Sequence, residues 1–183
     1  MAANTNIIQG ARIIANGGEI TSDRYKDDGS NDLTAGQICY LSGGTMVPLR
    51  SGAGVLNTSA SPFDAANQYF MVLKTKDVSE ATSDYVEVQK IEADTLLEGY
   101  VVDSGVSGDV EMATTDIGAK HPLYMTAAGW IAVDNVGTSN PIVKIEDVMD
   151  NYEPYQSAST FENDSGSVRH DRVRFKILSA LLA

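Results

Sequence analysis

A short pattern that occurs twice, at Cys39–Leu49 and at Leu123–Val133, limits the folds open to this chain more than any other part of its sequence. Each copy is an apolar–Tyr–apolar–Ser/Thr run, two or three small residues and a second apolar run, and each follows a glycine, Gly36 or Gly118. Aromatic and β-branched residues suit a half-buried strand and glycine supplies positive φ at a turn, so both copies predict a β-hairpin. The two copies are either independent instances of one hairpin pattern or the result of a true duplication. The aligned pairs are Tyr40 with Tyr124, Leu41 with Met125, Ser42 with Thr126, Met46 with Trp130, and Val47 with Ile131.

Other runs along the chain also have the length and composition of strands. They are Gln68–Thr75, Tyr85–Ile91, Leu97–Val102, Val110–Met112, Pro141–Val148 and Arg172–Leu178. In the second of these, Val86 and Val88 share one face, and in the third Gly99 is a candidate β-bulge. We therefore expect an all-β fold in a single domain, a small β-barrel or a sandwich of short antiparallel strands.

The last of these strands has the clearest alternation. Val173, Phe175 and Ile177 share one face, and the other face carries three cations. These cations are Arg172, Arg174 and Lys176. Two accounts of this basic stripe are open: cross-strand pairing with Glu or Asp of a neighbouring strand, or a patch that complements an acidic partner surface.

Four segments make up the predicted single domain, 1–183. Residues 1–32 are an extended N-terminal arm that ends in the acidic, glycine-containing loop Asp23–Asp32, and residues 33–149 are the β core. Residues 150–170 form a long loop, and residues 171–183 hold the C-terminal strand. Loops of this length tend to be functional or disordered.

The arm and the long loop carry the residues that we predict to contact other chains. Apolar pairs on the arm fit an edge strand folded back on its own domain or an arm lying on a neighbouring subunit. Aromatic residues on the loop fasten it to its own body or dock into another chain. The predicted protein-interface residues are Ile7, Ile8, Ile13, Ile14, Tyr152, Tyr155 and Phe161.

Composition argues against several classes of partner. The 183 residues carry a formal net charge of −12, which disfavours nucleic acid, where affinity comes largely from Lys and Arg. No apolar stretch reaches the roughly 20 residues of a membrane span, and no basic, apolar leader opens the chain, so we expect synthesis in a cytoplasm. The single Cys39 lies in an apolar strand, which favours a buried, inert thiol.

Residues for catalysis or for a metal do not assemble into a recognisable motif. His121 and His170 are the only histidines, so a His-rich metal site is not available. In the acidic loop, Arg24 and Lys26 stand where an EF-hand would need ligands. A pair of carboxylates for glycoside hydrolysis is not excluded by the sequence, because two acids that are distant in the sequence can meet in the folded chain. We expect no enzyme activity, no cofactor and no metal.

The stretches Gly36–Pro48, Gly118–Val133 and Asn140–Ile145, with short strands and Gly/Asp turns between them, resemble the small β-barrel decoration (cement) proteins of tailed bacteriophage capsids. The resemblance covers roughly Leu33 to Val148. It implies a non-enzymatic structural protein on the virion exterior, commonly a homotrimer. Such a protein binds an icosahedral shell and bridges neighbouring major capsid protein subunits against internal DNA pressure.

The same loose motifs suit a phage tail or fibre module. Such a module would bind a cell-surface saccharide or another virion protein. A concave site around Trp130 and Tyr124 would then be expected, whereas core packing is the alternative for Trp130, which aligns with Met46.

Overall fold

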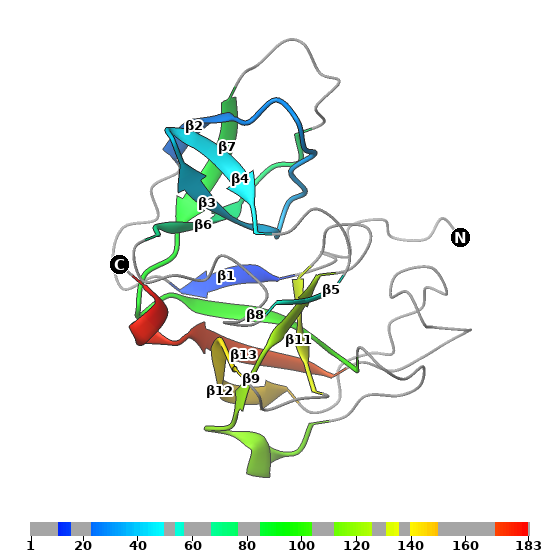
Figure 1. The fold of residues 1–183 in the computed structure, drawn as a ribbon. Helices are drawn as coiled ribbons and strands as arrows, with labels where there is room; N and C mark the ends of the chain where they lie inside the picture. The colour runs from blue at the N-terminus through cyan, green and yellow to red at the C-terminus, as the bar shows by residue number, and fades with distance from the viewer. Residues whose placement is uncertain are drawn as a thin grey trace, which may run out of the picture.

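The computed structural model describes residues 11–15, 23–49, 54–56, 67–76, 85–103, 112–125, 131–135, 140–149 and 171–182. These residues form a closed barrel stacked on a curled sheet, so the prediction of an all-β fold is confirmed (Figure 1). The helical elements among them are two 3₁₀ turns, η1 (Thr114–Asp116) and η2 (Ser179–Leu181).

Five strands close the barrel in the order β2–β4–β3–β6–β7. Their bounds are β2 Asp23–Asp27, β3 Ile38–Ser42, β4 Thr45–Pro48, β6 Tyr69–Val72 and β7 Tyr85–Lys90. The first predicted hairpin is confirmed as β3–β4, in which Ser42 lies opposite Thr45. Gly43 and Gly44, with φ of 57° and 90°, form the two-residue turn, as expected where both turn positions need positive φ.

The predicted loop at Asp23–Asp32 is wrong in its first half, because Asp23–Asp27 forms strand β2. Tyr25 packs inside the barrel with its ring centroid 5.2 Å from that of Phe70, and its charged neighbours lie on the outer face. The strand is held by pairing with β7 and β4, contacts that acidic local composition does not reveal.

The second body is an eight-stranded sheet with the order β5–β10–β11–β8–β13–β12–β9, and β1 also pairs with β8. The bounds of its longer strands are β8 Leu96–Val102, β12 Val143–Met149 and β13 Arg172–Ile177. The shorter strands are β1 Arg12–Ala15, β5 Gly54–Leu56, β9 Lys120–His121, β10 Leu123–Met125 and β11 Ile131–Asp134. Antiparallel pairing of β10 with β11 confirms the second hairpin.

The predicted alternation of the last strand is also confirmed. Val173, Phe175 and Ile177 of β13 are buried in the core. Gly99 pairs with Val173 in regular register, so the candidate bulge there is wrong. Register shifts lie instead in β12, between Ile145 and Asp147, and in β1, between Ile13 and Ala15.

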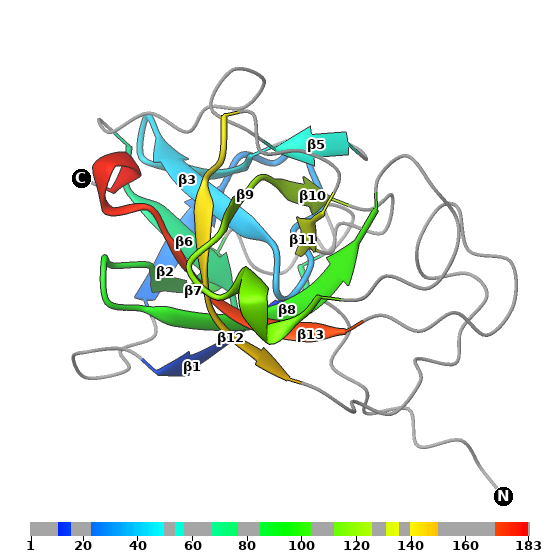
Figure 2. The ribbon, with the colours of Figure 1, turned by 90° about the horizontal axis from the view of Figure 1, so that it is seen from below.

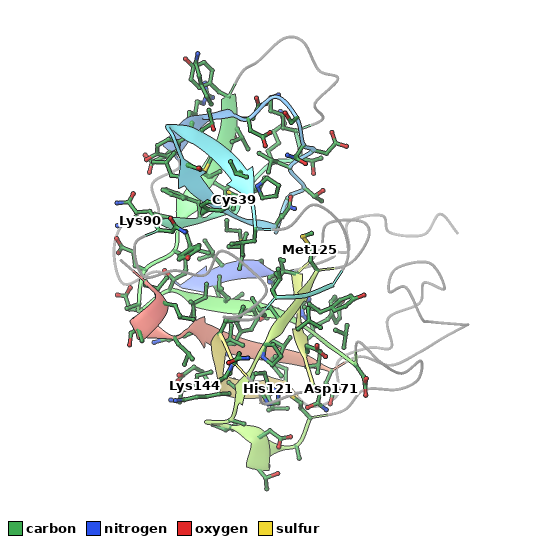
Figure 3. The ribbon with its side chains drawn as sticks, viewed as in Figure 1. Cys39, Lys90, His121, Met125, Lys144 and Asp171 are labelled. Atoms are coloured by element: carbon green, nitrogen blue, oxygen red, sulfur yellow. The ribbon has the colours of Figure 1, made fainter. Side chains whose placement is uncertain are left out.

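One continuous apolar cluster joins the two bodies. Outward-facing barrel residues such as Met71 belong to the same cluster as sheet residues such as Leu97 and Phe175. Gln37 on the barrel side also lies with its side-chain nitrogen 3.4 Å from the sulfur of Met125, which Figure 3 places where barrel and sheet meet. The barrel and the sheet are therefore packed on one shared core.

Ala11, just before β1, lies between the two bodies. A Cβ built on Gly36 of the barrel would fall 2.7 Å from the carbonyl oxygen of Ala11, and one built on Gly99 of the sheet would fall 3.5 Å from its Cβ. Ala11 is 1% exposed. Gly36 is therefore needed for the close approach of the segment that leads into β1, whereas a Cβ at Gly99 would be in ordinary contact with Ala11.

Candidate interaction surface

Of the seven predicted interface residues, the structure describes Ile13 and Ile14, both in β1. The other five lie outside the described residues. They are Ile7, Ile8, Tyr152, Tyr155 and Phe161.

Strand β1 lies antiparallel on β8 of the same chain, with Ile13 opposite Leu97. Ile13 is half-buried and packs against the shared core, and Ile14 is also half-buried. Within the part of the chain that the structure describes, β1 pairs with β8 alone. This arrangement describes a single chain, and the contact of Ile13 and Ile14 with other chains stays a prediction.

A row of alternating charges begins at β1 and crosses the outer face of the sheet to β12. Arg12, Glu98, Arg174 and Asp147 lie opposite one another on β1, β8, β13 and β12. Glu98 is 1% exposed, and its carboxylate oxygens lie 2.8 Å from Arg12 Nη2, 2.9 Å from Arg172 Nη2 and 3.6 Å from Arg174 Nε. Such pairing compensates for a carboxylate that would be costly to bury alone.

Pairing of the β13 arginines with acids was one of the two accounts drawn from the sequence, and it is confirmed for Arg172 and Arg174. Arg174 Nη1 also lies 3.4 Å from a carboxylate oxygen of Asp147. The central role of Glu98 was missed. One signal was available, because Glu98 is the single charged residue in the otherwise apolar run Leu96–Val102.

Beside this charge row lies a small apolar cluster. The Arg172 guanidinium carbon lies 4.8 Å from the ring centre of Tyr100, at the distance of a cation–π contact. Tyr100 packs in turn with Val102, Tyr124 and Ala132. Tyr124 is 9% exposed, so it does not present a free ring of the kind expected for a saccharide site, and Trp130 lies outside the described residues.

A shallow pocket of about 210 Å³ opens on the barrel, at β2 and β7 and the residues that follow β6. It is lined by Arg24, Lys74, Thr75, Lys76, Tyr85, Val86 and Glu87. Tyr85 is 51% exposed, whereas Arg24 donates to Glu87 over 2.8 Å, and Lys76 forms an ion pair with Asp27. The pocket therefore offers one aromatic face among polar groups that are mostly paired.

Acidic groups of the loop after β2 are engaged in local turns. The Asp28 carboxylate accepts hydrogen bonds from the backbone N–H groups of Ser30 and Asn31, and Asp27 accepts one from Gly29. These bonds form Asx-type turns. Among the described residues, no group of three or more His, Cys, Asp or Glu is placed to hold a metal ion.

Of the three side chains considered for reactive chemistry, the structure describes Cys39 and His121. Cys39 lies inside the barrel (Figure 3), 3.6 Å from the sulfur of Met46, and burial raises the pKa of its thiol to about 12. The prediction of a buried thiol is confirmed, and a protonated thiol is a poor nucleophile. His121 is buried with Nδ1 3.3 Å from the backbone oxygen of Asp134, and His170 lies outside the described residues.

Comparison of the chain with family models, with curated proteins and with solved structures found no match. Among the described residues, no helix has the length and apolar character that a membrane-crossing segment requires.

Proposed function

We propose that this chain is a structural virion protein. In this proposal it binds the outer surface of an icosahedral phage capsid, as a homotrimer, and cements neighbouring major capsid protein subunits. The proposal names no catalytic step, cofactor or metal. It starts from the resemblance in the two hairpins, and its physical argument comes from the N-terminal strand.

The observation that carries the proposal is the way β1 is attached. This strand joins the sheet through a backbone ladder to β8 alone among the described strands, and it holds Ile13 and Ile14. Strand addition of this kind works equally well between chains, because the backbone supplies affinity and alternate side chains supply specificity. An apolar edge strand is thus a suitable element for joining a protein to a neighbour.

The packing of barrel and sheet on one core supports the same proposal. A protein that holds a shell together against internal pressure has to transmit load between its contact points, and close-packed interiors have low compressibility. Three copies linked in a trimer would bind far more tightly than one, because each later contact forms at a high effective concentration.

The test is co-sedimentation of the purified protein with expanded capsids of its phage, together with light scattering of the free protein. We expect saturable binding, a trimeric mass and a higher temperature of capsid disruption. Ile14→Asp should weaken capsid binding, and Leu73→Asp, a change at an exposed barrel residue, serves as the matched control. Absence of capsid binding by well-folded protein would refute the proposal.

A second function is favoured by one observation, the exposed ring of Tyr85 in the barrel pocket. Aromatic faces beside polar groups suit sugar rings, so a tail or fibre module that binds a cell-surface saccharide is the alternative. A glycan array tests it: binding that is lost in Tyr85→Ala and kept in Leu73→Ala supports the saccharide function. An array without signal removes this alternative.

A further inference from the structure

All Lys and Arg side chains of five strands lie on one face of the sheet, the outer face. These strands are β1, β8, β13, β12 and β9. Side chains that lie directly opposite in antiparallel pairs point to the same side of a sheet, so the register defines this face. One row across it is Lys120, Lys144 and Lys176, and the next is the charge row through Arg174. In Figure 2, β1, β8, β13 and β12 lie close together in the lower half of the body.

The face is positive on a strongly acidic chain. These five strands hold six cations and three acids, whereas the whole chain has a formal net charge of −12. The cations are Arg12, Lys120, Lys144, Arg172, Arg174 and Lys176, and the acids are Glu98, Glu146 and Asp147. Arg12, Arg172 and Arg174 are largely compensated through Glu98 and Asp147.

The lysine row, defined as Lys120, Lys144 and Lys176, has less compensation. Lys144 Nζ lies 3.1 Å from a carboxylate oxygen of Glu146. No carboxylate of the described residues lies within ion-pair distance of Lys120 or Lys176. Like charges directly opposite on neighbouring strands destabilise a sheet, so the row is not explained by the stability of the fold.

The row is also accessible. Lys120 is exposed, the Lys144 side chain is 45% exposed, and Lys176 is half-buried. Figure 3 places Lys144 at the outer margin of the sheet body. Neighbouring strands are about 4.8 Å apart, so the row presents ammonium groups at a spacing close to the 5–6 Å between side chains one turn apart on a helix.

We propose that the lysine row is a docking surface for a carboxylate-rich segment of a partner protein. Lysine is a compact charge on a flexible stem, which fits carboxylates whose positions vary. Nucleic acid fits less well, because the chain's overall negative charge repels a polyphosphate and acids are interspersed with the cations of this face. If the proposed function holds, the acidic segment would belong to the capsid surface, and the present proposal adds only the chemistry of that contact.

The probe is fluorescent poly-L-glutamate of about 20 residues, titrated at about 0.01 M salt, where screening extends over roughly 30 Å. The row variant replaces Lys120, Lys144 and Lys176 by Gln. The matched control replaces Arg24, Lys26 and Lys74 on the barrel by Gln, which removes the same charge from exposed positions. We expect the row variant to bind about five- to fiftyfold more weakly than wild type and the control to change less than about twofold.

Equal weakening in the two variants would attribute binding to net charge and overturn the proposal, as would unchanged binding in the row variant. A single-stranded oligonucleotide of equal charge that binds through the row more tightly than poly-L-glutamate would replace the protein partner by nucleic acid. A salt-sensitive rise in the mass of the protein alone, lost in the row variant, would identify a second copy as the occupant. Capsid co-sedimentation is scored separately, so the proposed function can fail while the row still binds poly-L-glutamate.

Discussion

Two glycines that precede the two hairpins offer a test of how the N-terminal segment is held. Gly36 and Gly118 have similar positive φ angles, 84° and 91°. A Cβ at Gly36 would fall 2.7 Å from the carbonyl oxygen of Ala11, whereas a Cβ at Gly118 would meet no atom within 4 Å. Alanine at either position therefore incurs strain from a positive φ, and only Gly36→Ala adds a steric conflict.

The magnitudes follow from these two effects. Alanine in the left-handed region costs about 1–2 kcal/mol, which is the whole loss expected for Gly118→Ala. At Gly36 the conflicting atom belongs to backbone, and Ala11 is 1% exposed, so it has little room to move away. Overpacking of this kind costs about 1–3 kcal/mol more, so we expect Gly36→Ala to lose about 2–5 kcal/mol in total.

The assay is equilibrium unfolding in urea, with thermal unfolding as a second measure. Each 1 kcal/mol corresponds to about 2–4 °C in a chain of this size. Trypsin cleavage after Arg12 should also become faster in Gly36→Ala and stay unchanged in Gly118→Ala. If the two variants lose equal stability, to within about 0.5 kcal/mol, the close packing of Ala11 against Gly36 does not contribute to stability and the reasoning is refuted.

Two further predictions concern buried groups. Glu98→Gln leaves three guanidiniums beside a neutral amide, and because Arg12 and Arg174 are partly exposed, we expect the lower end of the 3–5 kcal/mol cost of breaking a buried pair. Glu87→Gln, in an exposed pair, should cost less than about 1 kcal/mol in the same urea titration; similar losses would contradict the assignment. The buried Cys39 thiol, with its pKa raised from 9.0 to about 12, keeps its proton when folded and loses it when unfolded, so stability falls as pH rises through this window. From pH 8 to pH 10, wild type should lose about 1.4 kcal/mol more than Cys39→Ala, and equal losses would show that the thiol ionises in the folded barrel.

Part of the candidate surface could be predicted because the relevant signal was local. Arg172 and Arg174 alternate with apolar residues, and period-two alternation assigns a face whatever the neighbouring strand is. Pairing of these cations with acids followed from ordinary cross-strand chemistry. The identity of the acid, Glu98, did not follow, because register between strands separated by more than 70 residues is set by tertiary packing.

The sequence by itself determined the all-β class, both hairpins and the buried faces of strands such as β7 and β13, since these depend on alternation within a few residues and on glycine at a turn. Tertiary structure alone decided that Asp23–Asp27 closes a barrel and that β1 lies on β8. It also decided that Lys120, Lys144 and Lys176 form one row. The physical reason is shared: each of these features is a pairing between distant segments, whose free energy comes from burial and backbone hydrogen bonds that no local window of residues contains.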